Sequence, residues 1–226
     1  RILADIAEAE AAAGGSDATP TGTLSLTASV LFGQMHVLPI VMQYLDAYPA
    51  MKAKTLFVDR PVNIVDEGID VAVRIGRLPD SGLSSIKVGT VRRVICGSPD
   101  YFERYGIPNT PADLKDHRIA VSTGAWASPE WRFANEQRVT IDATLQCNTN
   151  EAAITFARQG RGLTRVLHYQ IGPALMAGDL QIILSEYEEP PMPIHILHPE
   201  GRSASAKVRA FVGIAKAVLR ENRFLN

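Results

Sequence analysis

The sequence lacks the features that mark nucleic-acid binders, disulfide-stapled proteins and membrane proteins. Its 23 Lys and Arg residues are offset by 24 Asp and Glu, so the formal net charge is −1 and no basic surplus is available for nucleic acid. The two cysteines, Cys96 and Cys147, lie too far apart for a CxxC motif and are expected to be free thiols. No apolar run reaches the length of a membrane-spanning helix, and we expect a cytoplasmic protein without membrane contact.

Motifs that carry catalysis are also missing from the sequence. The five histidines do not show the spacing of a metal site such as HExxH, and no GxSxG nucleophile elbow is present. The segment Gly160-Arg161-Gly162 is not a phosphate-binding loop, because no Gly-Lys-Ser/Thr follows it. We therefore expect neither an enzyme nor a bound metal or cofactor.

The residues that are present give an ordinary globular composition, 46% hydrophobic and 21% charged over 226 residues. That length is sufficient for one large domain or for two smaller lobes with cores of their own. At the start of the chain, the Ala- and Glu-rich residues from Ile2 to Ala13 predict a helix. Gly14-Gly15 and Pro20 predict the end of that helix and a linker, so residues 1–20 are expected to stand apart from the lobes.

Strands and helices alternate in the next part of the chain. Residues 23–28 predict a strand, and residues 33–48 carry an apolar stripe that ends at Pro49 and predicts an amphipathic helix. The elements expected next are a strand at 54–58, a short helix at 61–67 that begins with proline, and a strand at 69–75. This βαβαβ order implies right-handed crossovers and a doubly wound lobe.

The remainder of the chain predicts a second α/β unit. Two strands at 83–88 and 91–96, with no helix between them, are expected to lead out of the first lobe. The elements that follow are strands at 118–121, 131–134, 139–141, 144–147, 163–166 and 194–197, with helices at 151–159, 168–176 and 204–220. Because the last helix can return to cover the first lobe, we assign residues 21–96 and 197–226 to lobe I and residues 97–196 to lobe II.

Several segments, taken in order, resemble the effector-binding domain of the LysR-type transcription regulators. Asp59-Arg60 and the run from Glu67 to Gly76 (EGIDVAVRIG) are similar to the family pattern D-R…E-G-x-D-x-A-I-R-I-G. The run from Arg92 to Tyr101 (RRVICGSPDY) matches the family pattern R-R-V-L-C-A-S-P-x-Y. Shorter matches fall in the same order at Ser29–Gly33, Leu38-Pro39, Tyr48-Pro49, Pro111–Leu114 with His117, Trp131–Phe133, Gly178–Leu180 and Lys207–Val212.

This resemblance implies two doubly wound, Rossmann-like α/β lobes around a ligand cleft, as in type 2 periplasmic solute-binding proteins. It also implies an N-terminal winged helix-turn-helix that provides all contact with DNA, and a linker helix whose end is formed by residues 1–13. The sequence departs from the family at Gly160–Arg165 (GRGLTR), where many members have Gly-Leu-Gly-Ile-Ala.

The resemblance further implies a homodimer or homotetramer. Helix 33–48 carries more apolar residues than one buried stripe requires, and it would pack antiparallel on the second lobe of a twin subunit in an isologous dimer. The alternative is that a single chain covers both faces of this helix.

Two helix starts that follow strands form the candidate ligand site. In the first, Ser29 is followed by the backbone N–H groups of Val30, Leu31 and Phe32; in the second, Asn148, Thr149 and Asn150 precede the helix. Unpaired N–H groups and the helix dipole attract anions at such positions. The residues alone favour a simpler interpretation, in which Ser29 and Asn150 only cap their helices, and it is the family resemblance that favours the ligand interpretation.

Three further side chains complete the expected binding set. Arg74 ends an apolar strand, where it could hold a ligand carboxylate in a bidentate fork or, equally, form a structural ion pair with Asp59 or Asp70. Trp126 lies in a loop and could supply an apolar wall, and Ser122 is the third member of the set.

The sequence therefore predicts an effector-sensing, oligomerising regulatory module. A small organic or aromatic acid would bind between the lobes and bias the angle between them. The alternative from another class is a transport-type solute-binding protein of the same fold. A winged helix-turn-helix upstream of Arg1 would favour the regulator, whereas a secretion signal would favour the transporter. On its own, the chain is expected not to bind DNA specifically.

Overall fold

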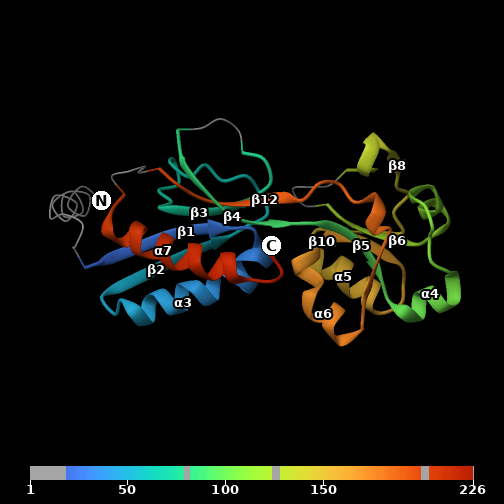
Figure 1. The fold of residues 1–226 in the computed structure, drawn as a ribbon, viewed down its shortest axis with the longest axis horizontal. Helices are drawn as coiled ribbons and strands as arrows, with labels where there is room; N and C mark the ends of the chain where they lie inside the picture. Colours follow the sequence, from blue (N-terminus) through green and yellow to red (C-terminus); the bar gives the residue numbers. More distant parts are fainter. Residues whose placement is uncertain (1–18, 79–81, 124–127, 200–203, 226) are drawn as a thin grey trace. The chain divides into compact units, whose positions relative to one another are not determined.

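The structure is a computed structural model that describes residues 19–78, 82–123, 128–199 and 204–225. These residues form two compact units: one comprises the chain up to Thr90 together with Pro193 onward, and the other runs from Val91 to Met192. Each unit has its own five-stranded sheet with helices beside it, so both are α/β (Figure 1). The chain therefore passes twice from one unit to the other.

Both passages fall earlier in the chain than the boundaries expected at 96/97 and 196/197. Strand β5 (Arg93–Gly97) pairs with strands of the second unit, and β12 (Met192–His198) pairs with β3 (Val71–Ile75) of the first. Pairing between strands that are distant in sequence decides the unit to which a strand belongs. An apolar run such as 91–96 can fit either sheet, because its composition says nothing about its pairing partner.

The first unit is built on a sheet with the strand order β2-β1-β3-β12-β4. Strand β1 (Gly22–Ala28) lies between β2 (Met51–Phe57) and β3 and runs parallel to both. Strand β12 is antiparallel to β3, and β4 (Ser84–Val91) forms the outer edge of the sheet. Because β1, β2 and β3 are parallel, their carboxyl ends meet at one edge of this sheet.

Two helices from opposite ends of the chain, α3 (Leu38–Ala47) and α7 (Ala206–Glu221), pack together beside this sheet (Figure 1). The fully buried ring of Tyr44 lies edge-on to Phe211, with the ring centroids 5.6 Å apart. The Tyr44 hydroxyl donates a hydrogen bond to the carbonyl oxygen of Lys207 at 3.2 Å. The expected return of the last helix to the first lobe is confirmed.

The helical segment after β1 begins at Val30, earlier than the expected start at residue 33. It consists of α2 (Val30–Phe32), a π-helical turn (Gly33–Val37) and then α3. A Cβ atom at Gly33 would lie 2.4 Å from the ring of Phe57, so only glycine allows this turn to approach β2 so closely. π-helical turns are frequent at functional sites. This one directly follows α2, whose start is one of the two helix starts in the predicted ligand site.

The prediction of a helix at residues 61–67 is wrong, because these residues form an irregular segment and a turn. The side-chain oxygen of Asn63 accepts hydrogen bonds from the backbone N–H groups of Val65 (3.1 Å) and Asp66 (3.3 Å). Gly68 then adopts a φ of 63°, which is typical of a residue that ends a turn. An asparagine that bonds to the backbone two residues ahead favours a turn over a helix.

The second unit has a sheet of the order β11-β5-β10-β6-β9 and a separate hairpin. Strands β5 and β10 are antiparallel, whereas β10, β6 and β9 are parallel. The expected strands and helices at 118–121, 144–147, 151–159 and 163–166 are confirmed within a few residues, whereas β11 was not predicted. The bounds are β6 (Ile119–Ser122), β7 (Glu130–Arg132), β8 (Arg138–Thr140), β9 (Leu145–Cys147), β10 (Leu163–Leu167), β11 (Gln181–Ile183), α4 (Pro99–Tyr105), α5 (Asn150–Arg158) and α6 (Gly172–Ala177).

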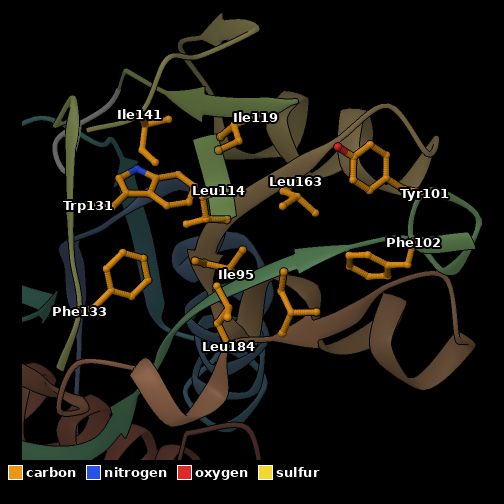
Figure 2. Packing of buried hydrophobic residues seen from close by; sticks show 11 residues of the cluster. Ile95, Tyr101, Phe102, Leu114, Ile119, Trp131, Phe133, Ile141, Leu163 and Leu184 are labelled. Atoms are coloured by element: carbon orange, nitrogen blue, oxygen red, sulfur yellow. The ribbon is translucent and has the colours of Figure 1, made fainter. Parts of the chain in front are cut away.

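The core of the second unit is aromatic at both ends (Figure 2). Trp131 and Phe133, from the β7 hairpin and the residues after it, lie to one side of Ile95, whereas Tyr101 and Phe102 from α4 lie to the other. All five side chains are buried. The hairpin is therefore held against the sheet by its aromatic side chains.

Burial of His36 in the π-helical turn predicts a pH dependence of stability. Burial lowers the pKa of this imidazole from 6.5 to about 4. The unfolded chain takes up a proton near pH 6.5 that the folded chain takes up only near pH 4, so lowering the pH across this interval should lower the free energy of unfolding. In urea unfolding curves across this range, His36→Gln should be less pH-dependent than the parent. Equal pH dependence of the two proteins would contradict the prediction.

Candidate functional site

The carboxyl edge of the first sheet gathers polar residues from three parallel strands. Ser29 directly follows β1, Asp59 follows β2, and Arg74 is the penultimate residue of β3. The register pairs Thr27 with Ala72, and its continuation by two residues brings Ser29 level with Arg74. Ligands bind at this edge in open α/β sheets, so the first unit places two of the predicted binding residues where a ligand is expected.

Part of the predicted anion site at the start of α2 is already engaged. The N–H of Val30 donates to the Oδ1 atom of Asp59 at 3.1 Å, and the N–H of Gly33 donates to the carbonyl of Ser29 at 2.7 Å. The side chain of Ser29 makes no capping hydrogen bond, so its hydroxyl does not have the helix-cap role that was considered for it. Leu31 is half-buried and Phe32 is fully buried, so any contact of Phe32 with a ligand would be through its backbone.

Arg74 is half-buried and has an unused donor. Its Nη2 atom is buried and lacks a hydrogen-bond partner among the described residues. Burial lowers the pKa of this guanidinium, and the charge of Glu67 opposes that shift. Glu67 itself lies 3.4 Å from Arg60. A buried guanidinium nitrogen without a partner is costly, and an acceptor on a ligand would remove that cost.

Neither of the two ion-pair partners considered for Arg74 is used. Asp70 forms an ion pair with Lys207 at 3.1 Å and accepts a hydrogen bond from the backbone N–H of Ser25 at 2.7 Å. Asp59 accepts the hydrogen bond from Val30. Among the described residues, Arg74 therefore forms no ion pair with Asp59 or Asp70, and its role as a ligand contact stays a prediction.

His195 is a candidate site residue that the sequence did not reveal. It is the partner of Arg74 across the antiparallel pairing of β12 with β3, so the two side chains share one face of the sheet. Its Nδ1 atom is also buried without a hydrogen-bond partner, and burial followed by the charge of Lys87 lowers its pKa. The only available signal was a histidine within the apolar run Ile194–Leu197, which does not identify the strand that it pairs with.

The second unit places the remaining predicted residues at the carboxyl edge of its own sheet. Ser122 of β6 pairs with Cys147 of β9, and the Asn148-Thr149 turn follows. The hydroxyl oxygen of Thr149 accepts a hydrogen bond from the N–H of Ala152 at 3.3 Å, so Thr149 is the helix cap. Asn150, which was considered as the cap, is instead the first residue of α5.

The remaining expectations concern Trp126, metal ligands and membrane-spanning helices. Trp126 lies outside the described residues, so its predicted role as a wall remains a prediction. Among the residues that the structure describes, no three His, Cys, Asp or Glu side chains are arranged to hold a metal ion. Every helix within the described ranges is too short or too polar to span a bilayer.

Comparison with known proteins identifies one family. The family described as the LysR substrate binding domain matches residues 17–220. An uncharacterized HTH-type transcriptional regulator of Haemophilus influenzae is 30% identical over 210 residues, which cover 92% of this chain and 73% of the relative. CrgA, a LysR-type transcriptional regulator from Neisseria meningitidis, has a TM-score of 0.81 at 21% identity, with 98% of this chain and 76% of that chain covered. The regulatory domain of AphB in Vibrio vulnificus has a TM-score of 0.74 at 22% identity, with 87% and 98% covered.

The hydrogen bonds at the two helix starts predict different effects of removing each hydroxyl. Thr149→Val removes the cap of α5 and should lower the free energy of unfolding by roughly 0.5–2 kcal/mol. Ser29→Ala removes no capping bond and should change it by less than about 0.5 kcal/mol. Urea unfolding followed by circular dichroism measures both values, with Asn148→Ala at the neighbouring exposed position as the control. Equal destabilisation by the two substitutions would show that these roles are wrongly assigned.

Proposed function

Because this chain belongs to the family of LysR substrate binding domains, we propose that it senses a small organic or aromatic acid for a DNA-binding transcription regulator. Contact with DNA is assigned to a winged helix-turn-helix that lies outside these residues, and the full protein acts in the cytoplasm. The Haemophilus relative supports a regulator over a transport-type solute-binding protein, because it is itself a transcriptional regulator. Nothing in the role requires catalysis.

The proposal that the ligand is an acid rests on the guanidinium of Arg74. Its buried Nη2 atom has no partner within the described part of the chain, and both carboxylates considered for it are engaged elsewhere. A planar carboxylate matches the guanidinium fork and would provide the missing acceptor. His195 on the adjacent strand could add a second hydrogen bond to the same ligand.

The hydroxyl of Ser29 also supports a ligand site at the carboxyl edge of the first sheet. It is half-buried, makes no capping bond and lies level with Arg74 in the strand register. The N–H groups of the first helical turn would add donors, although the acid would have to compete with Asp59 for that of Val30. In the second unit, Ser122 and the residues from Asn148 to Asn150 stay a prediction as contacts of the same ligand.

The ligand proposal predicts a specific loss on substitution of Arg74. A thermal-shift screen of organic and aromatic acids against the whole chain should identify a ligand, because binding to the native state raises the melting temperature. Calorimetry should then show that Arg74→Gln weakens its binding by about tenfold or more, as expected for loss of a charged hydrogen bond. Arg77→Gln, at an exposed position three residues further on, is the matched control. If Arg74→Gln binds the identified acid as tightly as the parent, the site lies elsewhere.

The surface of α3 supports the proposed homodimer. Ile40, Val41 and Tyr44 are buried within the first unit, whereas Leu38 and Met42, one helical turn apart, are 38% and 56% exposed. The chain therefore covers one face of this helix and leaves apolar side chains on another. We propose that a twin subunit covers them, in the antiparallel arrangement that the family resemblance implies.

The dimer proposal predicts that a charge at Met42 promotes dissociation. Burying an unpaired carboxylate in an apolar interface is costly, so Met42→Glu should raise the dimer dissociation constant by about tenfold or more. Light scattering over a dilution series measures that constant. The matched control is Gln43→Glu, which adds the same charge at the next exposed position. A parent chain that stays monomeric at high concentration, or equal effects of the two substitutions, would refute the proposed surface.

A further inference from the structure

His195 and Arg74 form a polar pair at the end of an apolar sheet face in the first unit. The register of β12 with β3 places His195 opposite Arg74 and Leu197 opposite Ala72. Side chains alternate between the two faces along a strand, so both pairs lie on the same face. Ala72 and Leu197 are buried in an apolar cluster, whereas the polar pair lies at the carboxyl end of β3. The apolar core of this face therefore ends where the two polar side chains begin.

Each side chain of this pair has a buried nitrogen without a partner. Nη2 of Arg74 and Nδ1 of His195 make no hydrogen bond with any described residue. Residues directly opposite each other in an antiparallel pair have Cβ atoms about 4.5–5.5 Å apart, so a group of the size of a carboxylate can contact both. A carboxylate has two oxygens that accept hydrogen bonds, one for each nitrogen. The pair can therefore act as one site for an anion.

The groups around His195 disfavour its protonated form in the free protein. Strand β12 lies between β3 and β4 in the sheet. Burial, followed by the charge of Lys87 in β4, lowers the pKa of the imidazole below its usual value, and Arg74 faces it from β3. The charge of Glu67 favours the cation of Arg74. His195 is therefore neutral at neutral pH while no acid is bound.

We infer that His195 takes up a proton when an acid binds at Arg74, so that the affinity of this site for the acid rises as the pH falls. The carboxylate brings a negative charge beside the imidazole, which favours the protonated ring and accepts a hydrogen bond from its Nδ1–H group. The proton comes from solvent, and no covalent bond of the acid forms or breaks. The inference rests on the acid site proposed at Arg74 and adds a regulation of that site by pH.

The direction of the effect follows from the two pKa values of His195. The bound acid raises the pKa of the ring above its value in the free protein, so between the two values the complex holds a proton that the free protein lacks. Affinity therefore rises as the pH falls through this interval, and His195 adds no pH dependence outside it. A nearby opposite charge shifts such a pKa by roughly 1–3, which corresponds to a gain in affinity of about tenfold or more.

Histidine NMR signals measure this protonation directly, with benzoate as the probe. The chain has five histidines, and the signal missing from the spectrum of His195→Gln is that of His195. Titration from about pH 8 to about pH 5.5 at constant ionic strength gives its pKa without benzoate and with excess benzoate. Benzoate should raise this pKa by about one or more, whereas its neutral analogue benzamide should not. The pKa of His117, in the second unit, should be the same throughout. An equal pKa of His195 with and without benzoate would overturn the inference.

Affinity measured over the same pH range separates the proton uptake from the acid site on which it rests. Calorimetry should show that the parent binds benzoate about tenfold more tightly at the acidic end of the range, whereas His195→Gln binds it with little dependence on pH. Arg74→Gln should weaken binding at every pH. If Arg74→Gln binds benzoate as tightly as the parent, the acid site itself is wrong. If Arg74→Gln binds more weakly but His195→Gln keeps the pH dependence of the parent, only the proton uptake is wrong.

A surface charge provides an independent test of the electrostatics around His195. Lys87→Gln removes an exposed cation that acts on His195, so it should raise the pKa of His195 in the free protein and shift the pH dependence of benzoate binding toward higher pH. The matched control is Lys52→Gln, which removes the same charge at an exposed position on β2, at the opposite edge of the sheet. Equal effects of the two substitutions on the pKa of His195 would refute this electrostatic basis of the inference.

Discussion

The candidate site in the first unit depends on the parallel pairing of β1 with β2 and β3. Parallel strands end at one edge, so this pairing brings together Ser29, Asp59 and Arg74, which are distant in sequence. Side chains alternate between the faces of a strand, and a slip of one residue in β3 would turn Arg74 toward the apolar face that carries Val73. The apolar residues of β3 thus fix the orientation of its one charged side chain.

Each unit has a partly desolvated arginine on one strand of its sheet. Among the described residues, neither Arg74 in β3 nor Arg165 in β10 forms an ion pair, although the charges of Glu67 and Glu189 act on them; Arg165 contacts the Arg132 carbonyl and the Trp131 ring. Leaving a cation partly desolvated costs stability, and an apolar side chain at the same position would avoid that cost. A ligand carboxylate would offset this desolvation cost only while it is bound. The free energy that the unliganded protein lacks in stability would therefore contribute to the affinity for acids.

The sequence predicted the parts of this fold that depend on local pattern. The apolar stripe of residues 33–48 and the strands of the first lobe follow from side-chain periodicity, and the family resemblance supplied their arrangement. The helix expected at 61–67 failed because the side chain of Asn63 bonds to the backbone ahead of it. His195 could not be predicted as a site residue, because its place beside Arg74 arises from a pairing between strands distant in sequence. Likewise, only the structure shows that Asp59, which the sequence offered as an ion-pair partner for Arg74, accepts a hydrogen bond from the start of α2.

The hydrogen bond from Val30 to Asp59 has a consequence for the response of such a domain. This carboxylate is tethered beside the helix start, where its effective concentration is high and does not change with metabolism. An acid that uses the same N–H group must displace the Asp59 carboxylate. The apparent affinity of the acid therefore reflects the difference between its own binding free energy and that of the Asp59 carboxylate. The side chain at position 59 would then set the concentration at which the domain begins to respond. A protein with a neutral residue there would respond to scarcer metabolite with no change in the groups that contact the ligand.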